Sequence, residues 1–136
     1  MNYDTRFHQT TKYRSEGRPP HVAHISAYVG NKLGSSFGTG AYFVTQDKMN
    51  HPRNSQYPFI VLKADAKQMN GFMNEVRKAK LFYHGFIREM IETTDDAEIE
   101  RILAKKPDAE IEYLGIGVFG LHEAIKTLTK EFSLWK

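Results

Sequence analysis

The chain has 136 residues, of which 40% are hydrophobic and 26% are charged, with a net charge of +3 and no cysteine. This length accommodates one domain with a real core, so we expect residues 1–136 to form a single domain. The absence of cysteine excludes disulfides, thiolate catalysis and cysteine-ligated zinc. No apolar run is long enough to span a membrane and no secretory signal is recognised, so the expected location is the cytoplasm, with no membrane partner.

The N-terminal segment has little apolar character. TRFHQTTKYR contains only two sizeable apolar side chains, Phe7 and Tyr13, although its three threonines favour a strand. We therefore expect residues 1–12 to form an edge strand or an arm. An arm of this kind can be exchanged between the subunits of a homodimer.

Residues 18–34 predict the first helix, since two prolines stand where a helix begins, apolar residues recur at helical spacing, and Gly34 ends the pattern. A short strand over residues 41–46 and a loop follow. The continuous apolar run of residues 57–64 is bounded by turn residues, which is typical of a central strand covered on both faces.

The second half continues the alternation of helices and strands. A helix that begins after Asp65 has an apolar stripe, and Asp95 with Glu98 forms a capping-box pattern at the start of another helix. The remaining expected elements are a mixed strand over residues 80–91, a helix over 95–106, a buried strand over 110–119 and a helix over 121–132. Such alternation indicates an α/β fold.

Three stretches, YPFIVLKADAKQM, FIREMIETTDD and EYLGIGVFGLHEAIKTLTKEFSLW, together with the Pro-Pro start of the first helix, carry a family resemblance. They resemble an uncharacterised bacterial family, domain of unknown function two thousand, over roughly residues 12–136. Its members share the fold of type 2 peptidyl-tRNA hydrolase. The resemblance implies a three-layer α/β sandwich, in which a mixed, four-stranded and mostly parallel sheet has helices on both faces.

The catalytic pattern of those hydrolases is not present. The first helix has His21, Ile25 and Tyr28 near the positions of the hydrolases' lysine, glutamine and histidine, and HGFIREM lacks their Asp-x-Gly-x-Thr element. Because a shared fold does not carry an activity with it, we identify no catalytic residues and leave open whether the protein is an enzyme.

The first helix nevertheless offers polar side chains for binding. His21, His24 and Tyr28 lie on one stripe of the helix, and Arg14 and Arg18 precede it. A helix N-terminus with nearby arginines favours an anion, although the two prolines remove donors, and a solvated helix face is the alternative explanation. No acidic residue completes a ligand set with the two histidines, so no metal site is predicted.

Gly115, Gly117 and Gly120 have the spacing of a dinucleotide-binding loop, G-x-G-x-x-G. Only 16 residues follow Gly120, too few for the strand-helix-strand unit that such a loop opens. We interpret these glycines as close-packing points on a buried strand and predict no cofactor.

These observations lead to three hypotheses for function. Residues 1–80 contain 12 Lys or Arg against 5 Asp or Glu, which favours a binding module for an anionic ligand, either a nucleotide-like molecule or RNA. Its groove is expected near the first helix, at the ends of the parallel strands. The alternatives are a hydrolase of peptidyl-tRNA or a related aminoacyl ester, and a homodimeric interaction protein without a small ligand.

Overall fold

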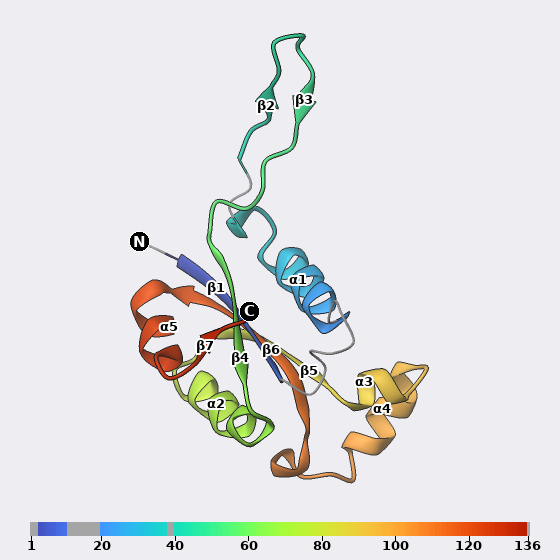
Figure 1. The fold of residues 1–136 in the computed structure, drawn as a ribbon. Helices are drawn as coiled ribbons and strands as arrows, with labels where there is room; N and C mark the ends of the chain where they lie inside the picture. The colour runs from blue at the N-terminus through green and yellow to red at the C-terminus, as the bar shows by residue number, and fades with distance from the viewer. Residues whose placement is uncertain (1–2, 11–19, 38–39, 136) are drawn as a thin grey trace.

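The computed structural model describes residues 3–10, 20–37 and 40–135, which form an α/β body and a projecting arm (Figure 1). The strands of the body are β1 (Tyr3–Thr10), β4 (Phe59–Ala64), β5 (Phe82–Ile87), β6 (Tyr113–Leu121) and β7 (Ser133–Leu134). The helices are α1 (Pro20–Leu33), α2 (Ala66–Lys78), α3 (Glu89–Glu92), α4 (Asp96–Leu103) and α5 (His122–Thr129), with short 3-10 turns η2 (Gly34–Phe37) and η3 (Asp108–Glu110). The arm consists of β2 (Phe43–Val44) and β3 (Asn50–His51).

The body contains a five-stranded sheet with the order β5-β6-β1-β4-β7. Among the described strands of this sheet, only β1 and β4 pair in parallel, whereas the three other pairings are antiparallel. The predicted four-stranded, mostly parallel sheet is therefore wrong. Helices α3 and α4 stay near the end of the sheet where β5 finishes, so β6 enters there and must run back in the opposite direction (Figure 1).

The N-terminal strand lies in the centre of the sheet. Residues Thr5–Thr10 of β1 pair with β4, and residues Tyr3–Gln9 pair with β6 on the other side. The expectation that residues 1–12 form an edge strand or an arm is corrected for residues 3–10, which are hydrogen-bonded on both sides. Long-range pairing, rather than the apolar content of the segment, decides this position.

Helices cover both faces of the sheet, as Figure 1 shows, with α1 on one face and α2 and α5 on the other. Buried side chains form two clusters, one on each face. The cluster beneath α1 contains Ile25, Val29, Phe37, Phe86, Leu114 and Phe119. The cluster beneath α2 and α5 includes Met69, Met73, Val76, Ile116, Val118 and Ile125.

The ends of the helices follow the local sequence signals. The backbone N–H of Glu98 donates to Asp95 Oδ1 at 2.7 Å at the start of α4, and the backbone N–H of Asp65 donates to Gln68 Oε1 at 2.8 Å before α2. The predicted strand over residues 80–91 ends at Ile87, and α3 follows. Within the described part of the chain, no helix has the length and apolar character to cross a membrane.

The glycines of the G-x-G-x-x-G spacing lie inside β6 and not in a loop. A Cβ atom on Gly120 would lie 2.7 Å from Leu81 Cδ2, so this glycine allows the close approach of a neighbouring side chain. The spacing has a packing explanation at this position.

Candidate functional site

A cavity of about 460 Å³ lies between α1, the end of β5 and the segment that carries α3 and α4. Imidazoles and an aromatic ring line one side, and carboxylates line another. Its lining includes His24, His84, Phe86, Asp95, Asp96 and Glu100. Pockets that combine apolar walls with a few polar groups are the usual sites of small ligands.

Ring contacts between α1 and β5 build one wall of this cavity. His24 stacks on Phe86 with ring centroids 5.4 Å apart, and Tyr28 meets His84 edge to face at 4.3 Å. Two positions four residues apart on a helix are separated by about 6 Å, and two positions two apart on a strand by about 6.6 Å. Because these two spacings are nearly equal, the two rings on α1 lie opposite the two rings on β5.

His84 is electrostatically unusual. Burial lowers the pKa of its imidazole below the ordinary value, and the charge of nearby His24 lowers that pKa further. Its Nδ1 atom is buried and has no hydrogen-bond partner among the described residues. No hydrogen bond from the described residues therefore fixes the proton at Nδ1, and a neutral imidazole is able to donate or accept through Nε2.

The opposite side of the cavity is acidic. Asp95 caps α4, while Asp96 and Glu100 are exposed at the first turns of the same helix. The dipole of a helix favours negative charge at its N-terminus, which is consistent with acidic residues at these positions. The described walls thus favour a positively charged or hydrogen-bond-donating group beside α4.

The sequence-predicted site residues divide into two groups. His24 contributes directly to the cavity, and Tyr28 contacts His84 on the adjoining part of α1. His21 belongs to α1 through its backbone, but its side chain lies outside the described part. Arg14 and Arg18 also lie outside the described residues, so their role stays a prediction.

Sequence reasoning missed the residues that the topology brings to α1. His84 and Phe86 lie at alternate positions of β5, and Asp96 and Glu100 come from α4. The histidine inside an otherwise apolar strand was the available signal, because imidazoles in strands are polar groups that need a partner. The sequence alone did not indicate that β5 packs beside α1.

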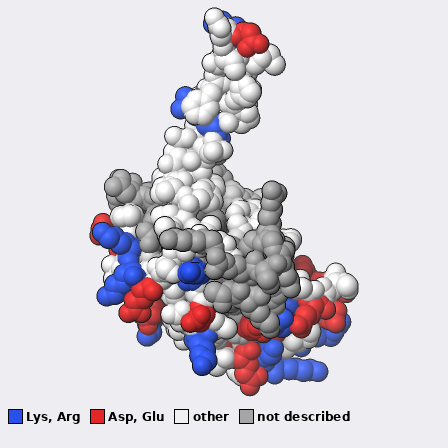
Figure 2. Space-filling model, viewed as in Figure 1, with Lys and Arg blue, Asp and Glu red and all other residues white. Residues whose placement is uncertain are grey.

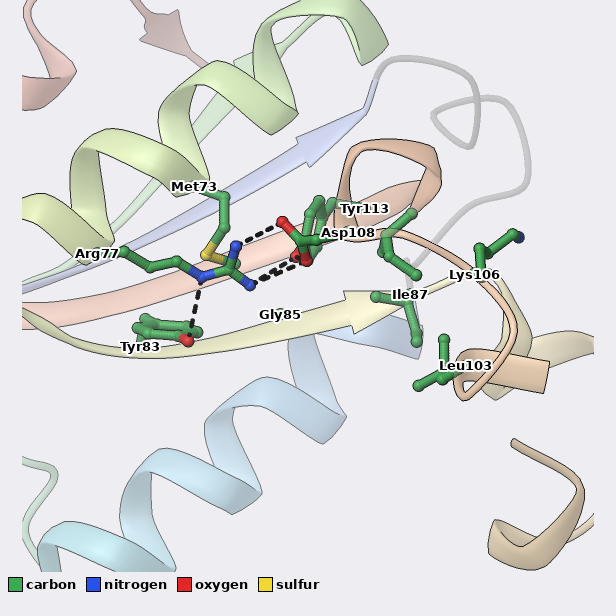
Figure 3. Close-up of a pocket in the computed structure, with 10 residues that line it drawn as sticks. Met73, Arg77, Tyr83, Gly85, Ile87, Leu103, Lys106, Asp108 and Tyr113 are labelled. Carbon is green, nitrogen blue, oxygen red and sulfur yellow. Dashed lines mark hydrogen bonds and ion pairs between the residues drawn. The ribbon is translucent and has the colours of Figure 1, made fainter. Parts of the chain in front are cut away.

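A second cavity, of about 330 Å³, lies on the opposite face of the sheet beneath α2 (Figure 3). Arg77 points into it and donates to Asp108 from both terminal nitrogens, at 2.6 and 3.2 Å. Tyr113 Oη accepts from Arg77 at 3.0 Å and donates to Asp108 at 3.0 Å, while Tyr83 Oη accepts from Arg77 Nε at 3.3 Å.

This network holds parts of the fold together. The hydrogen bond from Arg77 is the main cause that lowers the pKa of Asp108, and burial followed by the hydrogen bond to Asp108 raises the pKa of Tyr113. Asn70 on α2 also donates to the carbonyl of Ile111 at 3.2 Å. Since the charges at this end of the cavity already pair with each other, we assign the network a structural role in fastening α2 to the segment before β6.

At the far end of the same cavity, two more charged side chains pair with each other. Lys106 Nζ donates to Glu89 Oε1 at 2.7 Å, and the Glu89 side chain is only 7% exposed.

Among the described residues, no group of three His, Asp or Glu side chains is placed to hold a metal ion.

The fold and the first cavity define a small mixed α/β protein with a histidine-lined pocket. A family described as "Protein of unknown function (DUF2000)" matches residues 21–136, and the chain belongs to this family. The resemblance to that family is thereby confirmed. A search of curated proteins gives no match.

A solved structure has a similar fold. It is a protein of unknown function from Agrobacterium tumefaciens strain C58, with a TM-score of 0.83 and 12% sequence identity, covering 100% of this chain and 99% of that one. At this level of identity the likeness concerns the fold alone. Neither similarity involves peptidyl-tRNA hydrolase, so a hydrolase-like fold is not confirmed.

Proposed function

We propose that the protein binds a nucleotide-like small molecule, with the base in the cavity between α1, β5 and α4. The observation that carries this proposal is the pairing of stacked rings, His24 on Phe86, with the neutral imidazole of His84 in one cavity of about 460 Å³. Planar rings stack on aromatic side chains, and each such contact contributes about 1–3 kcal/mol.

The polar groups of the cavity match the edge of a nucleobase. The carboxylates of Asp96 and Glu100 accept hydrogen bonds from an exocyclic amino group, and His84 Nε2 pairs with either a donor or an acceptor. Adenine, guanine and cytosine carry such an amino group, whereas uracil does not. We therefore expect a preference against uracil.

The anionic part of the ligand would contact a different group of residues. The acidic wall disfavours a phosphate beside α4, so a phosphate fits only away from Asp96 and Glu100. Arg14 and Arg18 come shortly before α1 in the sequence and are our candidates to bind it. The ligand would then be anionic at one end and donate hydrogen bonds at the other.

Calorimetric titration with AMP, GMP, CMP, UMP and adenosine tests the proposal. We expect at least one amino-bearing nucleotide to bind more tightly than UMP, and adenosine to bind more weakly than AMP with less dependence on salt. An absence of heat and of thermal stabilisation across the panel would contradict it. Stronger binding of short RNA than of any mononucleotide would identify RNA as the ligand instead.

Variants locate the site. The variant His24→Ala removes the exposed imidazole of His24 and should weaken nucleotide binding by roughly 5- to 150-fold through the lost stacking. His51→Ala, an exposed histidine on the distant arm, serves as the matched control and should have no effect. Arg14→Ala with Arg18→Ala should lower the affinity for AMP but not for adenosine.

The hydrolase hypothesis has one supporting observation. A histidine that stays neutral near pH 7 is suited to act as a general base, and His84 has this property. Incubation with peptidyl-tRNA tests it: ester cleavage above background that His84→Gln abolishes would favour this second candidate, and no cleavage would dismiss it.

A further inference from the structure

The arm carries large apolar side chains that the rest of the described molecule does not cover. Tyr42, Phe43, Val44 and Met49 are each between 57% and 60% exposed. Figure 1 shows the arm extending well away from the body, and Figure 2 shows that most of its surface carries no charge. Exposed apolar patches of this kind usually mark an interaction site.

The apolar residues occupy both faces of the arm. Phe43 pairs with His51 and Val44 with Asn50 across the two strands. Because side chains alternate between faces along a strand, Phe43 and Met49 lie on one face, while Tyr42 and Val44 lie on the other. An occupant that covers the arm must therefore contact both faces.

The turn at the tip gives the arm a defined shape. The backbone N–H of Thr45 donates to the carbonyl of Met49 at 3.0 Å, and that of Lys48 donates to the carbonyl of Thr45 at 3.0 Å. The backbone N–H of Met49 also donates to the Thr45 hydroxyl at 3.0 Å. At the base, the guanidinium of Arg53 lies 4.3 Å from the centre of the Phe43 ring.

We propose that the arm is a dimerisation element that packs against a second copy of this chain. A two-stranded hairpin without a third strand or a helix against it is only marginally stable in water. Packing against a partner would stabilise the arm, and another copy of the same chain is a partner that is always available. Homodimers with two-fold symmetry are the most common oligomers.

The area available indicates how the two copies meet. Each of the four side chains exposes on the order of 100 Å², so two arms that touch only each other would bury about 800 Å². This is below the roughly 1,200 Å² at which stable interfaces begin. If the body of the partner covers both faces of each arm, an equal area of body surface is buried as well, and the total reaches about 1,600 Å², the size of a standard interface.

The body offers a receiving surface near the base of the arm. Phe59 at the start of β4 is 45% exposed, and Leu121 at the end of β6 is 43% exposed. Both residues lie at the same end of the sheet, because Phe59 pairs with Thr5 of β1 and Leu121 with Tyr3. In a two-fold dimer, each arm would reach this end of the partner's sheet.

The charges of the arm are compatible with self-association. Asp47 and Lys48 at the tip have opposite signs, and the one other charged side chain on residues 40–54 is Arg53, which lies over Phe43. The arms therefore bring no cluster of like charge to the interface between two copies.

Sedimentation equilibrium of the full chain between about 1 μM and about 100 μM tests the proposal. We expect a monomer–dimer equilibrium in this range, and the double variant Val44→Thr/Met49→Thr should weaken it at least tenfold. Threonine keeps the strand propensity while it removes apolar surface from each face. Leu134→Thr changes a side chain that is 56% exposed on the distant strand β7 and should leave the dimer intact.

Three results would overturn the proposal. These are a monomer at every concentration, a dimer that the arm variant leaves unchanged, and a dimer that Leu134→Thr disrupts equally. Flotation with vesicles of phosphatidylcholine and phosphatidylglycerol provides a separate control. A monomer whose flotation depends on Val44 and Met49 would assign the arm to a lipid surface and reject the dimer.

Discussion

The ring of Tyr28 on α1 meets the imidazole of His84 on β5 edge to face, with centroids 4.3 Å apart. This contact covers a histidine whose Nδ1 has no hydrogen-bond partner in the described part of the chain. Tyr28, which the helix pattern predicted as a site residue, thus packs against His84, which the sequence pattern did not predict. Burial, followed by the charge of His24, lowers the pKa of this imidazole at the wall of the candidate site.

The depressed pKa of His84 makes the stability of the protein depend on pH. Burial is the main cause of the depression, and His24 adds to it. The unfolded chain takes up this proton below about pH 6.5, whereas the folded protein resists it, so the stabilising contribution is complete above that pH. We expect stability to fall as the pH decreases below 6.5 toward the lower pKa of the folded state.

The variant His84→Gln isolates this effect, because it does not titrate. Urea unfolding at pH 7.5, 6.5 and 5.5 should give a smaller loss of stability for the variant than for the natural chain. His51→Gln replaces an exposed histidine and should keep the natural slope. Equal slopes for His84→Gln and the natural chain would show that this imidazole does not resist protonation.

Gly85 is expected to be intolerant of any side chain. A Cβ atom there would lie 2.8 Å from Tyr113 Cε1 and 3.0 Å from Met73 Cε. Met73 is flexible, but the hydrogen bonds of Tyr113 with Arg77 and Asp108 hold the tyrosine ring in place. Gly85→Ala should therefore reduce the free energy of unfolding by about 1–3 kcal/mol.

Gly71 provides the matched glycine, because it lies within α2 and a Cβ atom there meets nothing within 4 Å. Gly71→Ala should stabilise the protein by about 0.5–1 kcal/mol through the higher helix propensity of alanine. Thermal unfolding of both variants checks the pair. We expect the two variants to change the free energy of unfolding in opposite directions. Destabilisation by Gly71→Ala, or tolerance of Gly85→Ala, would contradict the packing described around these two glycines.

The ion pair between Arg77 and Asp108 should contribute modestly to stability, since the two side chains are 37% and 52% exposed. A double-mutant cycle with Arg77→Met and Asp108→Asn should give a coupling energy of about 0.5–1 kcal/mol. The hydrogen bond from Arg77 lowers the pKa of Asp108, so this contribution is present at neutral pH. It should disappear as the pH falls below about 4 through that lowered pKa. A cycle whose coupling is zero at pH 7 would rule out the fastening role of the pair.

The local signals in the sequence predicted much of the fold. Asp95 marks the start of α4, the apolar run before Asp65 forms β4, and the second proline, Pro20, is the first residue of α1. These elements follow from capping and hydrophobic periodicity, which act within a few residues. Strand direction and order depend on where the connections lie in space, and for that reason the parallel sheet was wrongly predicted.

The candidate site also combines features that local sequence signals predict with features that depend on long-range packing. The stripe of α1 placed His24 and Tyr28 on one face, because helix geometry is local. Their partners on β5 and α4 are about 60 to 75 residues away in the sequence. The packing of α1 against β5 and β6 brings His84 and Phe86 into reach. The sequence led us to expect an anionic ligand, either a nucleotide-like molecule or RNA, and the acidic wall adds the expectation of a hydrogen-bond donor at the end of the ligand that lies beside α4.

Nitrogen–proton correlation spectra of the full chain, recorded during titration with AMP, test the central claim most directly. We expect the backbone amides of His24, His84, Phe86 and residues 93–100 to shift together with a single binding curve. Unchanged amides in this group at saturating AMP would contradict the claim, as would shifts confined to the residues around Arg77 on the opposite face of the sheet.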